Sequence, residues 1–289
     1  MNFEDLLVGK RLDPKHVLVL RHRPAEPELR KVLPWVAAEQ PDLFNAYQQT
    51  QSERLEASMR RSEYLASFVA HGPGKALFVG LYRIGPSKRL TREKFWKIPA
   101  YGELARFGWK GFGEHRSSVL WFDLTLERFY ADWKGKLVVG WPPPERSWWR
   151  RAHQNRFPVL AVLEDSALDR ESKAWDEIAL TREDLGVLPS RLKSALSQWR
   201  GIYYIFDVSD RRGYVGSAYG RENILQRWLA YAATGHGGNV RLRKRDPKNF
   251  RFSILQRVSP DMDEPAVIRL EGTWKERLHT GNPNGLNDN

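Results

Sequence analysis

The spacing of apolar residues separates a helical first part of the chain from a strand-rich continuation. Residues 52–68 contain neither Gly nor Pro, and apolar side chains before them recur near a period of 3.6, at Leu29, Val32, Leu33 and Val36. This spacing predicts helices over residues 27–70. Apolar runs bounded by Gly and Pro then predict strands, at residues 76–84, 118–126, 136–141 and 157–163.

These strands indicate a mixed α/β region whose sheet is strongly curved. The most polar stretch, residues 164–183, is interpreted as a connector, and a short helix is expected from Ser190. At Gly201 the apolar period changes from 3.6 to 2. We therefore expect an accessory α/β domain over residues 1–185 and a second domain over residues 186–289.

Two short apolar strands open the second domain. They surround the turn Ser-Asp-Arg-Arg-Gly, which predicts a β-hairpin. Alternation places Tyr203 and Ile205 on one face of the hairpin and Ile202 on the other. Tyr203 and Tyr214, on neighbouring strands, are then expected to face one site.

The rest of this domain alternates helix, strand and helix. The helix expected over residues 220–233 carries Arg227 and Tyr231 at i and i+4. A third strand follows at residues 250–255, and a last helix begins near Pro265 and carries Glu271 at the edge of its apolar stripe. The sequence therefore predicts an α+β fold, with a small three-stranded antiparallel sheet flanked by helices at the end of the chain.

Composition narrows the chemistry. The 289 residues include 47 Lys+Arg against 35 Asp+Glu, a formal net charge of +12, which favours an anionic partner such as nucleic acid. The absence of Cys excludes disulfides, cysteine-based zinc fingers, iron–sulfur clusters and cysteine nucleophiles. No uncharged apolar run is long enough to span a membrane, and the start Met-Asn-Phe-Glu-Asp lacks the order of a signal peptide. A cytoplasmic protein with no membrane partner is expected.

The order of these residues resembles the GIY-YIG endonuclease superfamily over residues 200–289. Gly201-Ile202-Tyr203 and Tyr214-Val215-Gly216 match the two halves of its name motif. Arg227 matches the family's helix arginine, Glu271 its metal-binding glutamate, and Asn287 the asparagine of its Gly-Leu-Asn ending. A bacterial subgroup of restriction or defence nucleases is similar at further positions, namely Tyr219-Gly220, Thr234–Asn239 and Trp274-Lys275.

The resemblance implies a metal-dependent DNA endonuclease whose products carry 5′-phosphate and 3′-hydroxyl ends. Glu271 would hold one Mg²⁺ or Mn²⁺, Arg227 would clamp a phosphate oxygen, and Asn287 would fix the geometry. Tyr203 and Tyr214 would position or deprotonate the attacking water. One carboxylate per protomer implies that cutting both strands needs a homodimer or sequential nicking.

Two roles are open for Tyr203 in the activation of the attacking water. Some members of the family carry His or Lys four residues after the helix arginine, where this chain has Tyr231. Tyr203 then serves either as the base or only to orient a metal-activated water. A tyrosine base would need its pKa lowered from about 10.

Several aromatic and basic residues are candidate DNA contacts. His236 lies in a Gly-rich loop that could touch phosphate, and a basic run follows it. Basic loops track DNA backbones but are also commonly solvated, and aromatic–cation segments stack on bases but also fill cores. The candidate contacts are Arg241, Arg243, Lys244, Arg245, Trp109, Trp148, Trp149, Arg150 and Arg151.

Three functions remain open for the whole chain. In the first, the upstream domain reads the target DNA, plain or modified, for a restriction or defence nuclease. In the second, it is a protein-interaction module of a structure-specific repair or recombination nuclease. In the third, the nuclease fold is degenerate and only binds DNA.

Overall fold

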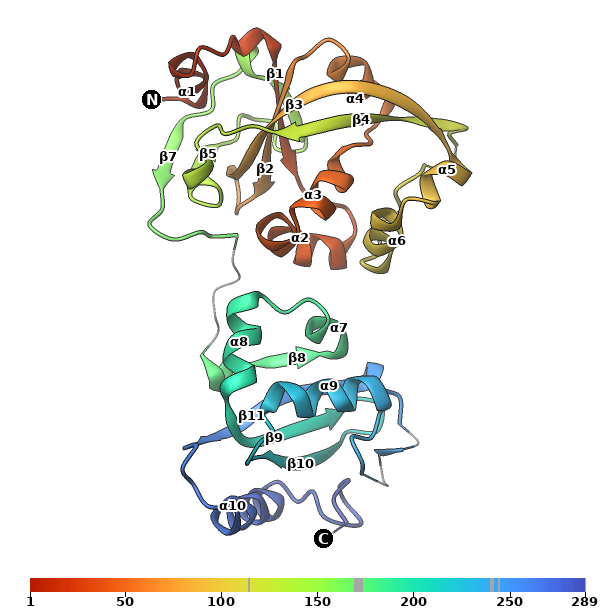
Figure 1. Cartoon of the computed structure of the whole chain (residues 1–289), viewed down its shortest axis with the longest axis vertical. Helices are drawn as coiled ribbons and strands as arrows, with labels where there is room; N and C mark the ends of the chain where they lie inside the picture. Colours follow the sequence, from red (N-terminus) through yellow and green to blue (C-terminus); the bar gives the residue numbers. More distant parts are fainter. Residues whose placement is uncertain (114, 169–173, 240–241, 244, 289) are drawn as a thin grey trace. The chain divides into compact units, whose positions relative to one another are not determined.

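The chain forms two compact units in the computed structural model, which describes residues 1–113, 115–168, 174–239, 242–243 and 245–288. The units are Met1–Arg170 and Glu171–Asn289 (Figure 1). The boundary therefore precedes the one expected after residue 185. The difference has a physical cause, because β8 (Ala179–Thr181) pairs with a strand of the second unit.

The first unit is built on a mixed seven-stranded sheet in the order β6-β1-β2-β3-β5-β7, with β4 paired to β3. Only the β1–β2 pair among these strands is parallel. Long β3 pairs with β5 and β2 along its first half and with β4 along its second, so the sheet curves as predicted (Figure 1). The strands are β1 (Val17–His22), β2 (Tyr64–Ala70), β3 (Lys75–Thr91), β4 (Ser118–Leu126), β5 (Leu137–Gly140), β6 (Trp149–Arg151) and β7 (Val159–Val162).

The helices of this unit follow the predicted helical region only in part. Three helices occupy most of residues 27–59 as expected, but residues 64–70 form β2 instead of a helix. Six of the seven residues of β2 are buried, so both of its faces are covered and no alternation marks it as a strand. The helices are α1 (Phe3–Gly9), α2 (Pro27–Glu39), α3 (Pro41–Gln48), α4 (Glu53–Met59), α5 (Arg92–Trp96) and α6 (Pro99–Arg106).

Aromatic rings hold the α1 side of this sheet together. Phe3 on α1 is fully buried and packs edge-on against Phe68, with ring centroids 5.2 Å apart. Phe78 and Phe129 complete the cluster. The first helix of the chain is thereby anchored to β2 and β3, and this unit has its own hydrophobic core.

The second unit contains a four-stranded sheet in the order β10-β9-β11-β8. The predicted three-stranded sheet gains β8 at its edge, from the stretch interpreted as a connector. Leu180 is the buried residue that attaches β8 to the core. The remaining elements are α7 (Arg182–Leu185), α8 (Ser190–Gln198), β9 (Arg200–Asp207), β10 (Arg212–Ala218), α9 (Ile224–Thr234), β11 (Phe250–Val258) and α10 (Glu264–Arg277).

Helices α9 and α10 cover opposite faces of this sheet (Figure 1). Tyr203 and Tyr214 pack with Trp228 of α9 in one core cluster. Ile202 packs with Val267 of α10 in another. The alternation predicted for the hairpin is confirmed.

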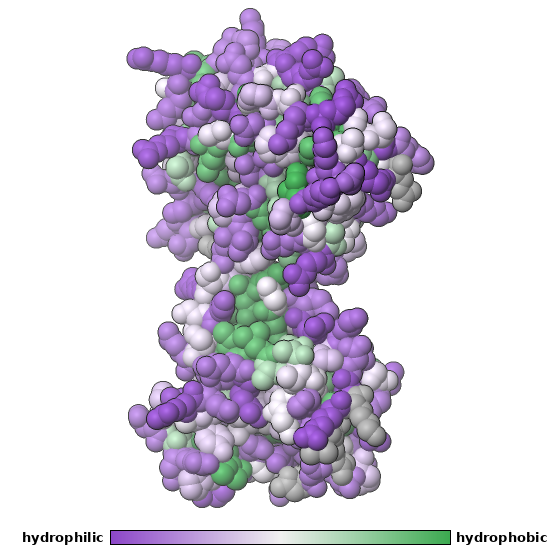
Figure 2. All heavy atoms as spheres, turned by 45° about the vertical axis from the view of Figure 1, so that its right-hand side comes forward, coloured by the Kyte–Doolittle hydropathy of each residue, from purple (hydrophilic) through white to green (hydrophobic). Residues whose placement is uncertain are grey.

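Polar residues dominate the face of the protein that Figure 2 shows. Figure 2 shows hydrophilic residues over most of its visible face, with smaller hydrophobic areas between them. Among the described residues, no helix combines the length and the apolar character needed to cross a bilayer.

Candidate active site

The hydroxyls of two tyrosines meet the guanidinium of Arg227 on the α9 face of the sheet. Arg227 Nε donates to the Tyr203 hydroxyl at 3.2 Å, and its second terminal nitrogen donates to the Tyr231 hydroxyl at 3.4 Å. The two hydroxyls lie 3.5 Å apart. The ring of Tyr214 lies 5.7 Å from that of Tyr231. The structure thus brings together the four residues that sequence analysis placed on this face.

Local geometry explains how strand and helix meet here. Tyr203 pairs across the hairpin with Gly216, and a Cβ at Gly216 would lie 2.5 Å from the Tyr203 hydroxyl. Only glycine leaves room for this ring. Asn223 caps the start of α9 by accepting from the Gln226 amide at 2.9 Å. The helix therefore begins four residues later than expected.

The surroundings keep these tyrosines protonated. Burial raises the pKa of Tyr203, and the nearby Tyr214 raises it further, against the opposite influence of Arg227. Burial likewise raises the pKa values of Tyr214 and Tyr231. A phenolate would lose its hydration in this cluster. The three phenols therefore act as neutral hydrogen-bonding groups.

Glu271 of α10 lies against the edge strand β10. One carboxylate oxygen accepts from the Ser217 hydroxyl, and the other contacts Lys275 Nζ at 2.9 Å. The side chains of Glu271 and Lys275 are each 18% exposed. The Glu271 charge is also among the groups that raise the pKa of Tyr214, after burial and Tyr231. The charge of Glu271 thus influences Tyr214, while the described contacts of the carboxylate are with Ser217 and Lys275.

The donor set at Glu271 fits a hard divalent cation. A carboxylate beside a hydroxyl offers oxygen ligands, and Mg²⁺ is commonly held by one or two carboxylates together with waters and substrate phosphates. No group of three or more His, Cys, Asp or Glu side chains suited to a metal occurs in the part of the chain that the structure describes. Glu271 would therefore be the main protein ligand, and a cation there competes with Lys275.

Asn287 organises the hairpin from a distance along the chain. Its side-chain oxygen accepts from the Val215 amide at 3.0 Å, and its nitrogen donates to the Val215 carbonyl at 2.8 Å. The side chain is 2% exposed. Asn287 pairs with the outer edge of β10 next to Tyr214, so its place in the structure is that of a positioning residue.

Removing this amide is expected to destabilise the second unit. Asn287→Ala leaves the buried amide and carbonyl of Val215 without partners, at a cost of about 1–3 kcal/mol in unfolding free energy. Urea denaturation followed by circular dichroism measures the change. Asn284→Ala, at an exposed position of the same loop, serves as the control. Equal stability of the two variants would contradict the positioning role.

His236 lies in the loop that follows α9, but its contacts are local. Its Nδ1 accepts from the Gly238 amide at 3.0 Å. The neighbouring Gly237 has a φ of +49°, and a Cβ there would lie 2.7 Å from the Tyr231 ring. The loop therefore packs against Tyr231 through glycine, while no described contact joins the His236 side chain to Arg227 or the tyrosines.

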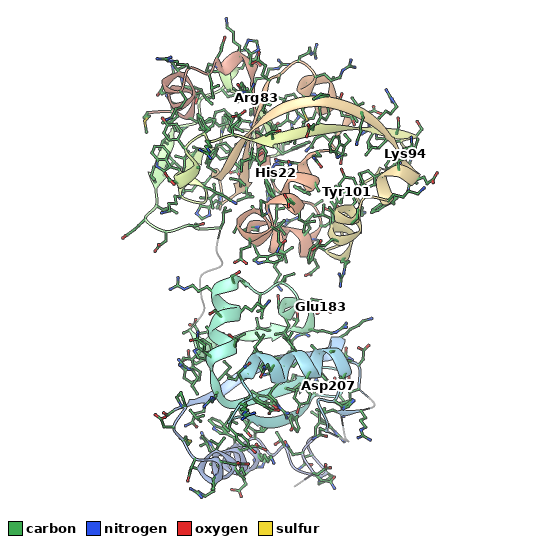
Figure 3. All side chains as sticks on the ribbon, viewed as in Figure 1. His22, Arg83, Lys94, Tyr101, Glu183 and Asp207 are labelled. Atoms are coloured by element: carbon green, nitrogen blue, oxygen red, sulfur yellow. The ribbon has the colours of Figure 1, made fainter. Side chains whose placement is uncertain are left out.

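The basic run after this loop divides into residues of different character. Arg241 and Lys244 lie outside the described residues. Arg243 is exposed and available to a phosphate backbone. Arg245 instead pairs with Asp207 at 2.6 Å and with Asp210 at 2.7 Å. Figure 3 labels Asp207, at the end of β9. The predicted DNA contact at Arg245 is replaced by a structural ion pair.

Breaking this pair is expected to cost stability. Asp207 is 1% exposed, so Arg245→Ala leaves a buried carboxylate without its cation, at a cost of about 3–5 kcal/mol. Thermal or urea unfolding measures the loss. Arg243→Ala is the matched control and should leave the unfolding free energy unchanged. If both variants were equally stable but bound DNA less tightly, Arg245 would be a DNA contact after all.

The aromatic and cationic residues of the first unit that are candidate DNA contacts also differ in their surroundings. Trp109 and Trp148 are half-buried and line one cavity. Trp149 lies in β6 beneath Arg54, whose guanidinium carbon is 5.8 Å from the indole ring. Arg150 donates to the carbonyls of Pro142 and Pro144 at 3.4 and 3.0 Å. Arg150 therefore braces the proline turn, which differs from the predicted phosphate contact.

Arg151 pairs with Leu18 in the sheet through its backbone. Its side chain is half-buried. No described contact brings it to Trp109 or Trp148. It therefore stays a candidate DNA contact of the β6 edge.

Sequence reasoning missed three residues around the site. Ser217 bonds Glu271 directly, Lys275 pairs with the same carboxylate, and Glu222 lies 3.5 Å from Arg227. The i,i+4 spacing of Glu271 and Lys275 was an available signal. The signal for Ser217 was weaker. Strand alternation places Ser217 on the sheet face opposite Tyr214, which is the face that α10 covers.

Comparison with known proteins finds similarity over less than a third of the chain. No protein-family model matches the chain, and no curated protein matches it. One solved structure, the catalytic domain of the homing endonuclease I-TevI, is 26% identical, with a TM-score of 0.27, and the match covers 31% of this chain and 98% of that domain. A single-residue mutant of the same catalytic domain is 23% identical, with a TM-score of 0.26. This match covers 31% of this chain and 93% of that domain.

Proposed function

We propose that this protein is a divalent-metal-dependent endonuclease that hydrolyses DNA phosphodiester bonds to 5′-phosphate and 3′-hydroxyl ends. The observation that carries the proposal is the cluster of Arg227 with the Tyr203 and Tyr231 hydroxyls. The Glu271 carboxylate of α10 contacts Ser217 of β10 in the same sheet. A fixed cation, neutral hydroxyl donors and a carboxylate are the groups that phosphoryl transfer requires. The positive net charge of +12 suits a polyanionic substrate.

Arg227 supplies the charge that the reaction needs. Phosphodiester hydrolysis places additional negative charge on the non-bridging oxygens, and a planar guanidinium meets two such oxygens at once. Two phenol hydroxyls hold the Arg227 side chain in the free protein. The site is therefore preorganised before DNA binds, which avoids reorganisation during the reaction.

Tyr203 orients the attacking water and is not its base. Burial holds the pKa of Tyr203 above its ordinary value, whereas a base at neutral pH needs a lowered one. A neutral phenol both donates and accepts a hydrogen bond. Of the two roles open from sequence, the orienting role is the one that we propose.

Glu271 and Ser217 would hold the divalent cation, Mg²⁺ or Mn²⁺. When bound there, the cation neutralises phosphate charge and stabilises the leaving 3′-oxygen. With one such carboxylate, each protomer cuts one strand. Cutting both strands then requires a homodimer or two successive nicks.

The chemical class of the reaction is tested by the ends of the product. An end-labelled duplex is cleaved in Mg²⁺, and the fragments are treated with DNA ligase either directly or after phosphatase. Resealing of the untreated nick alone is expected, because ligation requires a 5′-phosphate next to a 3′-hydroxyl. A nick that ligase cannot seal, such as one with a 3′-phosphate, would contradict the proposal.

The pH dependence of Tyr203→Phe tests the role of this tyrosine. Because burial raises the pKa of Tyr203, the phenol stays protonated from about pH 6 to 9, below its ordinary pKa of about 10. The variant should cleave roughly 10- to 100-fold more slowly, within the range of a lost positioning contact. Its rate–pH profile should run parallel to that of the parent. A profile that loses an ionisation in the variant would identify Tyr203 as the base.

The first unit is proposed to recognise the target DNA, in a restriction or defence role in the cytoplasm. Its half-buried Trp109 and Trp148 line a cavity, which supports a reading function over a protein-interaction one. Cleavage of plain, methylated and hydroxymethylated duplexes, and of branched substrates, compares the two. Preferential cutting of branched DNA, with equal cutting of all the linear duplexes, would favour the structure-specific role instead.

A further inference from the structure

A cavity of about 470 Å³ opens in the first unit, and none of the proposed nuclease residues lines it. Its volume lies within the range of small-molecule sites. It lies beside the C-terminal ends of β1 and α3. His22, the last residue of β1, is labelled in Figure 3. The lining of the cavity includes His22, Tyr47, Trp109 and Trp148. The proposed hydrolysis uses none of these residues.

Tyr47 and Trp109, two of the aromatic residues that line the cavity, belong to one ring network. The Tyr47 ring lies 6.0 Å from Trp109 and 5.3 Å from His22. Trp109 is supported from behind by Tyr101, at 5.4 Å. Side chains held in this way present rigid faces, which is the arrangement that stacks on a planar ring at little entropic cost.

His22 supplies an unused polar group at the cavity. The residue is 4% exposed, and its Nε2 has no hydrogen-bond partner. A buried polar atom without a partner is costly. Less than 1 Å² of this atom is accessible, so a ligand that pairs with it needs a small opening of the cavity wall and then gains affinity. Burial lowers the pKa of His22 to about 4. The imidazole is therefore neutral at pH 7 and offers a hydrogen bond rather than a charge.

A second cavity of about 370 Å³ adjoins the first, and the two share His22, Arg23 and Pro24 in their linings. It is lined by three arginines, Arg21, Arg23 and Arg30, and by a single carboxylate, Glu145. Arg21 is 3% exposed and lies 3.4 Å from Glu145. The lining stays net positive and suits a phosphate group. An aromatic cavity next to a cationic one matches a nucleotide, with its base in the first and its phosphate in the second.

We propose that the cavity walled by Tyr47, Trp109 and Trp148 binds a single nucleobase turned out of a DNA duplex, with His22 pairing to its edge. The inference rests on the proposed function, in which the first unit reads the DNA that the second unit cuts. The neighbouring arginines would hold a phosphate beside the ring, and the proposed function makes a DNA strand the source of that nucleotide. Turning a base out of the stack is least costly when it is already unpaired.

Binding and crosslinking of the cleavage-disabled full chain test this site. The Glu271→Gln protein, in EDTA, is titrated with a duplex that carries one unpaired 5-iodouracil and with the fully paired duplex, by fluorescence anisotropy. The unpaired duplex should bind at least tenfold more tightly. Ultraviolet irradiation should crosslink the iodinated base to peptides that contain Tyr47, Trp109 or Trp148.

Substitutions separate the cavity from general DNA binding. Trp109→Ala and Trp148→Ala should each remove the tenfold preference and leave the affinity for paired DNA within about twofold. Trp96→Ala, an exposed tryptophan outside the cavity lining, should keep the preference. Crosslinks obtained with all side chains in place do not depend on whether a variant folds.

Three results would overturn the inference. They are equal binding of the two duplexes, a preference that survives in both cavity variants, and crosslinks that map to other peptides. Competition by free 5-iodo-deoxyuridine monophosphate at micromolar concentration would indicate a free-nucleotide site instead and would also overturn it. None of these readouts needs cleavage, so failure of the nuclease proposal would be seen separately, in the ligation assay.

Discussion

Arg227→Ala is expected to lower the rate of DNA cleavage by about 10³-fold or more, the range associated with arginines that stabilise phosphoryl-transfer charge. The side chain is held by the Tyr203 and Tyr231 hydroxyls, so it contributes a fixed positive charge rather than a mobile one. Alanine removes this charge and also leaves two buried hydroxyls without their donor. Single-turnover cleavage of a labelled duplex at saturating protein measures the chemical step.

Two companion variants show whether charge or geometry matters at this position. Arg227→Lys keeps the charge but loses the planar fork, so it should recover only a small part of the rate. Arg221→Ala, an exposed arginine just before α9, should cleave at the parental rate. DNA affinity measured in EDTA should fall little for Arg227→Ala. Near-parental cleavage by the alanine variant would show that Arg227 only packs against the tyrosines.

Glu271→Gln should lower cleavage by a similar factor, about 10³-fold, because a bound cation supplies several kcal/mol of transition-state stabilisation. Glutamine keeps the shape of the side chain and can still accept from Ser217, so the fold is preserved. Loss of the negative charge removes the reason for a cation to bind. Electron paramagnetic resonance of Mn²⁺ should show binding to the parent and not to the variant.

Glu276→Gln is the matched control for this experiment. Glu276 lies on the same helix and is exposed, so the change alters the charge of the protein by the same amount without touching Ser217 or Lys275. Its cleavage rate and Mn²⁺ binding should equal those of the parent. Equal loss in both variants would indicate a general electrostatic effect in place of a metal ligand at Glu271.

The hairpin and its site were predictable because their signals are local. Strand alternation assigned Tyr203 to the face that α9 covers, and the i,i+4 spacing placed Tyr231 beside Arg227 on that helix. Short turns fix the register of a hairpin. The pairing of Tyr203 with Gly216 follows from that register.

Features that depend on distant pairing were not predictable. Strand β8 has three residues next to charged ones and is stabilised by β11, which lies far along the chain. The bond between Arg245 and Asp207 joins residues that no periodicity relates. Strand β2 is buried on both faces, and a continuous apolar run does not distinguish strand from helix.

The cavity of the first unit was also not predictable from the sequence, because it too depends on contacts between distant residues. Trp109 and Trp148 stand out in the sequence as aromatic residues near cations, but their meeting with His22 and Tyr47 requires the fold. The pairing of Glu271 with Ser217 likewise joins a helix to a strand. Residue types at the two sites are visible in the sequence, whereas their geometry comes from tertiary contacts.

Relaxation of supercoiled plasmid by the purified full chain tests the central claim most directly. With Mg²⁺, the account predicts conversion of supercoiled DNA to the nicked circle, no conversion in EDTA, and recovery when Mg²⁺ is added back in excess. Nicking that persists in EDTA, or plasmid that stays supercoiled at every Mg²⁺ and Mn²⁺ concentration, would contradict metal-dependent hydrolysis at this site.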